Sequence, residues 1–168
     1  MNAALSLGGV TVALALLWLN LRPWLKGSRD PKALLPYASG AGLGSVATIC
    51  TGGALGWGAA GIASLATRGG STGVRGVTGV SGAATLPTGR MGALTQPGAV
   101  VACVLLVGVC VLFKASGKQD KRRLVGGFVT FAILGFLPGV AYLLHWWPDT
   151  LNWLGAKGQD LANTGNAR

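Results

Sequence analysis

The sequence predicts an all-α integral membrane protein with about four transmembrane helices and a flexible Gly-rich loop between the second and the third. The 168-residue chain is 51% hydrophobic and has a mean hydropathy of +0.54. Only 11% of its residues are charged, against about 25% in a typical soluble domain. Its apolar residues gather in long runs, and about 20 apolar residues suffice to cross a bilayer core of roughly 30 Å.

Residues 1–67 are predicted to form an N-terminal pair of membrane helices joined by a basic loop, 22–32. The first run, 3–19, has basic residues after it and none before it, which favours an uncleaved anchor over a signal peptide. The second run, 33–67, is uncharged, and Pro36 suits the first turn of its helix. As one helix this run would be about 50 Å long. Whether it spans the membrane once or is broken at Gly52–Gly53 stays open.

Three further segments follow. Residues 68–97 are rich in Gly, Ser and Thr, a composition that cannot bury enough surface to order itself, so a flexible loop is predicted. Residues 98–147 are predicted to form a C-terminal membrane hairpin around a basic turn, 114–123, from runs at 91–113 and 124–147. Residues 148–168 are predicted to form an interfacial tail, with a short helix and a frayed end.

Charge predicts the orientation of this multi-pass protein. The net charge is +10, from 14 Lys and Arg and four acids. Most basic residues lie in the loops 22–32 and 114–123, which fall on the same side of the membrane if there are four spans. The positive-inside rule then places both loops in the cytoplasm.

One face of the second run carries a small residue at every fourth position. Such residues allow helix backbones to approach closely in a membrane. The stripe contains two G-x-x-x-G pairs and predicts a helix-packing surface. A homo-oligomer assembled through it is the expectation, but the sequence leaves open whether the packing is within one chain or between chains. The predicted packing residues are Gly40, Gly44, Thr48, Gly52, Gly56 and Ala60.

The basic turn predicts contact with phosphate. Lipid headgroups and non-specifically bound DNA both offer that chemistry, and the sequence leaves the choice between them open. The candidate residues are Lys114, Lys118, Lys121, Arg122 and Arg123.

Aromatic residues at the ends of the runs predict anchors at the membrane–water interface, namely Trp18, Trp24, Trp146 and Trp147. The runs contain no Asp, Glu, Lys or Arg, which disfavours an ion-coupled transporter. The sequence has no phosphate-binding loop, H-E-x-x-H or G-x-S-x-G motif. We therefore predict a protein that is not an enzyme and has no cofactor or metal site.

Several stretches together resemble a known family in layout. Asp30-Pro31-Lys32 precedes Leu34-Leu35-Pro36, and the stripe continues into Ile49-Cys50-Thr51-Gly52-Gly53-Ala54-Leu55-Gly56-Trp57. A later span closes with Lys114-Ala115-Ser116-Gly117-Lys118 and Asp120-Lys121-Arg122-Arg123. This layout is similar to the plasmid-spread (SpdB-type) membrane proteins of actinomycete conjugative elements.

The resemblance implies an accessory, structural or pore-forming subunit of a conjugative DNA-transfer apparatus in the bacterial plasma membrane. Its partners would be the lipid bilayer, further copies of the chain, and a DNA translocase or other transfer proteins. The basic turn would face DNA without sequence specificity. Three alternatives stay open: a phage-type holin or lysis protein, a pilin-like subunit, and a small membrane anchor for a partner protein.

Overall fold

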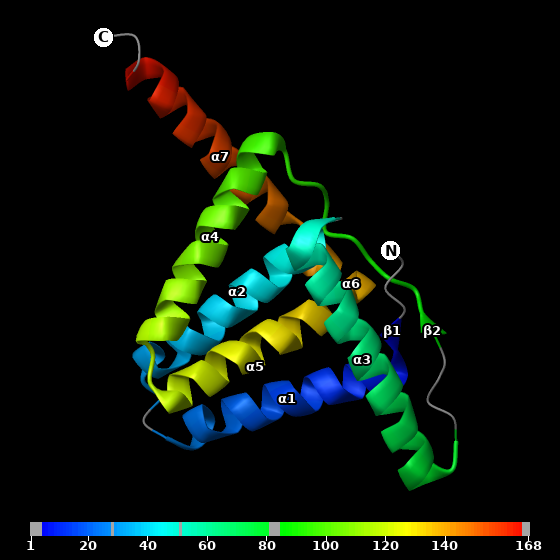
Figure 1. Cartoon of the computed structure of the whole chain (residues 1–168). Coiled ribbons are helices and arrows are strands. Elements are labelled where there is room, and N and C mark those ends of the chain that lie inside the picture. Colours follow the sequence, from blue (N-terminus) through cyan, green and yellow to red (C-terminus); the bar gives the residue numbers. More distant parts are fainter. Residues whose placement is uncertain (1–4, 28, 51, 81–84, 166–168) are drawn as a thin grey trace.

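The computed structural model describes residues 5–27, 29–50, 52–80 and 85–165, which are mainly helical (Figure 1). A short antiparallel pair joins β1 (Leu5–Ser6) to β2 (Thr85–Leu86), with Leu5 opposite Leu86. The helices are α1 (Leu7–Lys26), the 3-10 turn η1 (Pro31–Leu34), α2 (Leu35–Ile49), α3 (Gly53–Thr78), α4 (Gln96–Ala115), α5 (Lys118–Leu134), α6 (Pro138–Leu143) and α7 (Trp146–Gly165).

Helix α2 is the most deeply buried element. It packs mainly against α5, and α5 also packs against α1 (Figure 1). Helix α3 crosses α1, whereas α4 packs against α7. Small hydrophobic clusters fill these contacts, such as Leu43, Val109 and Leu124 between α2, α4 and α5. The core therefore consists of several separate helix–helix contacts, and the most extensive of them joins α2 to α5.

Two helices, α1 and α4, are long and apolar enough to cross a membrane. Each has 20 residues, which corresponds to about 30 Å of helix. Large apolar side chains on α4 are exposed, including Val104 and Val107 at 64% and 62%, as expected for a lipid-facing surface. The structure therefore supports a membrane protein with two such helices, or up to three if the pair η1–α2 and α3 forms one broken span.

The second apolar run is broken. Helix α2 ends at Ile49, α3 begins at Gly53, and the two parts are bent by 102°. Gly53 has a φ of +72°, a backbone conformation that favours glycine. The run is therefore broken next to Gly52–Gly53, as a broken span or a re-entrant loop. The expected start at Pro36 is confirmed within the first turn of α2.

The prediction of a flexible loop over residues 68–97 is wrong for the first part of that segment. Helix α3 continues through the glycines to Thr78, where Gly79 closes it with a φ of +71°. Gly70 packs against Gly8 of α1, so the segment does not have to bury its surface alone. Farther on, the Gly89 N–H donates to the Phe136 carbonyl over 2.8 Å. Tertiary contacts therefore order a composition that predicts disorder in isolation.

The fourth apolar run, 124–147, is not one transmembrane helix. Helix α5 ends at Leu134, and Pro138 then begins the short α6. Proline lacks the N–H that would continue the helix and clashes with the preceding turn. Much of the basic turn 114–123 also belongs to α5 itself. Helices α4 and α5 diverge from their junction, so the predicted hairpin is open (Figure 1).

The C-terminal segment forms a longer helix than predicted, α7, which packs on the start of α4. Gly155 lies against the Pro97 backbone, and Leu151 is only 1% exposed. Residues 166–168 of the predicted frayed end lie outside the described residues.

Asn152 ties α7 to the segment that leads into α4. Its Oδ1 accepts from the Thr95 N–H and Oγ–H at 2.8 and 3.0 Å, and its Nδ2 donates to the Ala93 carbonyl at 3.2 Å. We expect Asn152→Leu to lower the free energy of unfolding by about 0.5–1.5 kcal/mol, because these hydrogen bonds are lost while their exposed partners turn to water. The SDS midpoint of unfolding in detergent, followed by circular dichroism, measures this. The exposed Asn163 makes no such contacts, so an equal loss in Asn163→Leu would contradict the prediction.

Candidate phosphate-facing surface

The structure brings both basic loops to one end of the bundle. Helices α1 and α4 end there, while α2 and α5 begin there (Figure 1). Nine of the 14 Lys and Arg lie in these loops, together with two of the four acids, Asp30 and Asp120. We call this surface the basic end: Arg22, Lys26, Arg29, Lys32, Lys114, Lys118, Lys121, Arg122 and Arg123.

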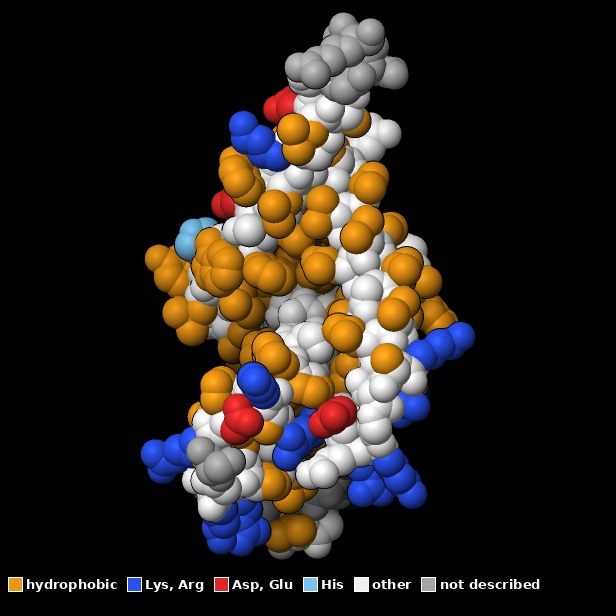
Figure 2. All heavy atoms as spheres, turned by 90° about the vertical axis from the view of Figure 1, so that its left-hand side faces the viewer, with side chains coloured by type: hydrophobic (Ala, Val, Ile, Leu, Met, Phe, Trp, Pro, Cys, Tyr) orange, Lys and Arg blue, Asp and Glu red, His pale blue; other side chains and the backbone are white. Residues whose placement is uncertain are grey.

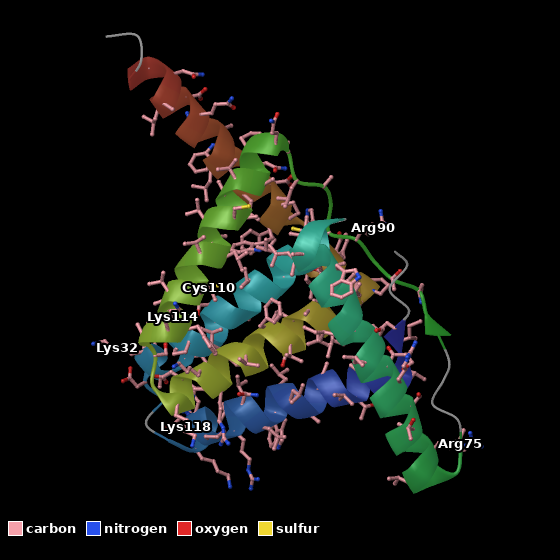
Figure 3. The ribbon with its side chains drawn as sticks, viewed as in Figure 1. Lys32, Arg75, Arg90, Cys110, Lys114 and Lys118 are labelled. Atoms are coloured by element: carbon pink, nitrogen blue, oxygen red, sulfur yellow. The ribbon has the colours of Figure 1, made fainter. Side chains whose placement is uncertain are left out.

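The basic end contrasts with the rest of the same face. On the face drawn in Figure 2, most Lys and Arg side chains lie in the lower part, and mainly hydrophobic side chains lie above them. Figure 3 shows Lys32, Lys114 and Lys118 at one end of the molecule, with Arg75 and Arg90 on the opposite side. The surface therefore combines an apolar belt with a positively charged end, as expected where a membrane protein meets a headgroup region.

The five cations of the predicted basic turn differ in their surroundings. The Arg123 guanidinium donates to the Ala33 carbonyl over 2.7 Å, which ties α5 to η1. The Lys121 ammonium lies 5.5 Å from the centre of the Phe113 ring, a cation–π distance. Lys114 and Lys118 are exposed. Arg123 is thus a structural contact, and Lys114 and Lys118 are open to a ligand.

A groove of about 790 Å³ lies between α1 and α5 beside the basic end. Lys121 and Arg122 line it, whereas Lys114 and Lys118 do not. The sequence does not indicate this groove, because it depends on how α5 is rotated against α1. The residues that line it are Leu16, Leu19, Asn20, Phe113, Lys121, Arg122, Val125, Gly126 and Val129.

The predicted helix-packing stripe is divided by the break after α2. A Cβ added to Gly40 would meet the Leu124 carbonyl of α5, and one on Gly44 would lie 2.5 Å from the Phe128 carbonyl oxygen. Thr48 also lies against α5, at Gly135. These three residues therefore pack within the chain.

The other half of the stripe does not continue this face, because α3 points in another direction. Gly52 has open space beside it, and Gly56 lies against the Cys50 carbonyl across the break. Ala60 is half-buried farther along α3. The six predicted packing residues therefore do not form one continuous surface for a second chain.

The four Trp residues predicted as interface anchors also differ in exposure and contacts. Trp18 and Trp146 are exposed, at 60% and 50%. The Trp24 indole N–H donates to the Asp30 carbonyl over 2.8 Å, so this ring closes the basic loop. Trp147 instead packs among Val46, Ala102 and Leu151 in the core. Trp147 is thus partly buried where α2, α4 and α7 meet, and its position at the membrane interface stays a prediction.

No group of three or more His, Cys, Asp and Glu side chains within the described residues could hold a metal ion. The fold and its basic end define a small helical membrane protein with one strongly cationic face. Comparison with protein-family models, curated proteins and solved structures gives no match to this chain.

Proposed function

We propose that the protein is a membrane-embedded accessory subunit of a DNA-transfer apparatus, whose basic end contacts DNA phosphates without reading sequence. The concentration of nine Lys and Arg at one end carries the proposal. Lysine and arginine side chains at a membrane surface provide the phosphate contacts of non-specific DNA binding. The biological setting of this proposal comes from the resemblance of the sequence layout to plasmid-spread proteins.

Lys114 and Lys118 are the DNA-facing residues in this proposal, with Lys32 at the same end of the molecule (Figure 3). All three are exposed, so a duplex can reach their ammonium groups. Arg123 keeps a supporting role through its contact with Ala33. The basic end would face the cytoplasm, where the positive-inside rule places it.

Self-assembly remains part of the proposal, but Gly40 and Gly44 are already covered by α5. Gly58 and Gly61 on α3 have open space beside them, next to the exposed Trp57. A second copy would therefore approach α3 or the exposed side of α4.

The salt dependence of DNA binding tests the DNA contact. Duplex DNA would be titrated with the protein in nanodiscs of neutral lipid while fluorescence anisotropy is recorded at several salt concentrations. We expect the double variant Lys114→Gln/Lys118→Gln to lower the slope of log K against log salt by about 1.8, because each phosphate contact contributes about 0.9.

The matched control removes two charges from the opposite side of the molecule, Arg75→Gln/Arg90→Gln (Figure 3). It should leave the slope unchanged. An equal decrease in both double variants would show that DNA responds only to net charge, and no binding by the unaltered protein would reject the DNA role.

A further inference from the structure

We propose that the groove between α1 and α5 binds one anionic phospholipid, with its phosphate between Lys121 and Arg122 and an acyl chain along the apolar floor. Lys121 and Arg122 belong to the basic end, but the proposed DNA-facing residues Lys32, Lys114 and Lys118 do not line the groove.

The lining divides into two chemical zones. The floor is aliphatic, formed by Leu16 and Leu19 of α1 and by Val125 and Val129 of α5. The cations Lys121 and Arg122 lie one turn earlier on α5, toward the basic end. A phospholipid has the same arrangement, with a charged head joined to an apolar chain.

The two cations have no carboxylate partner. Within the described part of the chain, neither Lys121 nor Arg122 forms an ion pair, and no Asp or Glu lines the groove. Lys121 is held instead over the Phe113 ring, 5.5 Å from its centre. A bound phosphate would supply the missing negative charge, and a guanidinium binds phosphate through paired hydrogen bonds.

Asn20 adds a polar group near the head of this site. Its Nδ2 donates one hydrogen to the Leu16 carbonyl over 2.8 Å, and an amide nitrogen carries a second hydrogen. A Cβ added to Gly126 would lie 2.6 Å from that nitrogen, so glycine at this position leaves room for the amide. Asn20 lines the groove, and we assign its second hydrogen to a phosphate or ester oxygen of the lipid.

The apolar floor favours a lipid over free phosphate or DNA. Neither of these ligands would use four aliphatic side chains, whereas an acyl chain would cover them. Helix α1 is also one of the two helices fit to cross a membrane, which places its groove beside lipid. Basic residues near a helix end reach toward the headgroup level.

Native mass spectrometry tests this assignment. The protein would be released from nanodiscs made of equal parts phosphatidylcholine and phosphatidylglycerol, and the lipid retained per chain would be counted. We expect the unaltered protein to retain one phosphatidylglycerol per chain. In Lys121→Gln/Arg122→Gln the affinity for this lipid should fall about 30-fold, because each basic residue near an anionic headgroup contributes about 1 kcal/mol. The matched control, Lys114→Gln/Lys118→Gln, removes the same charge outside the groove and should retain the lipid.

A second variant tests the floor without changing charge. Val125 is 47% exposed, and Val125→Trp would fill the groove, so it should also lose the lipid. Circular dichroism would verify that each variant keeps its helices. Equal lipid loss in the groove variant and the Lys114/Lys118 control, or unchanged retention in Val125→Trp, would overturn the site. Displacement of the lipid by inorganic phosphate would show that the acyl chain contributes nothing.

Discussion

Replacing Gly44 with alanine should unfold the protein more readily than any conservative change on the surface. The new Cβ would lie 2.5 Å from the Phe128 carbonyl oxygen and 3.1 Å from the Ala132 nitrogen. Both are backbone atoms of α5, so no side-chain rotation can relieve the overlap. Overpacking of a core costs about 1–3 kcal/mol and occasionally more. We expect a loss at or above the upper value.

A glycine of α5 is packed as closely against α2 as Gly44 is against α5. A Cβ on Gly127 of α5 would meet the Tyr37 carbonyl of α2, and one on Gly40 would meet the Leu124 carbonyl. Small residues on both helices therefore bring the two backbones into contact, as is common in membrane helix pairs. Gly127→Ala should accordingly resemble Gly44→Ala.

Gly42 is the matched control on the same helix. A Cβ there would have only the Trp147 ring at 3.9 Å, an ordinary contact distance. The midpoint of SDS unfolding should fall in Gly44→Ala and stay near that of the unaltered protein in Gly42→Ala. If Gly44→Ala caused an oligomer to dissociate while the unfolding midpoint of the single chain stayed constant, Gly44 would instead pack at an interface between chains.

The sequence could predict the helical membrane class and two of the long helices, because apolar length is a local property. Counting four spans does not explain why both basic loops lie at one end, because only two helices, or up to three, are fit to cross a membrane. The loops lie together because α1 and α4 end where α2 and α5 begin. The sequence could not predict the different surroundings of Arg123, Lys121 and Lys114. These depend on the rotation of α5 against α1 and η1, which is set by contacts distant in sequence.

The errors have a common cause. A flexible loop after Arg68 follows from composition only if the segment is considered alone, but α3 finds a partner in α1. The fourth run was expected to be continuous, yet Pro138 begins a new helix after a break. The stripe from Gly40 to Ala60 requires one straight helix, and the break after Ile49 divides it. Each expectation needed tertiary information that a local pattern does not contain.

Alanine substitutions at two neighbouring glycines of α3, Gly69 and Gly70, should change the free energy of unfolding in opposite directions. Gly70 lies against the Gly8 backbone of α1, and a Cβ on either residue would overlap the other. We expect Gly70→Ala to separate α3 from α1 and to lower the free energy of unfolding by about 3 kcal/mol, because two backbones must move apart.

Gly69 has open space where its Cβ would be. There the substitution acts only on helix propensity, in which alanine exceeds glycine by about 1 kcal/mol. Gly69→Ala should therefore raise the SDS midpoint of unfolding slightly, while Gly70→Ala lowers it. A flexible loop would respond weakly and alike to both changes. The sign difference between two adjacent positions thus separates a packed α3 from a disordered segment, and equal responses would show that residues 68–78 do not pack on α1.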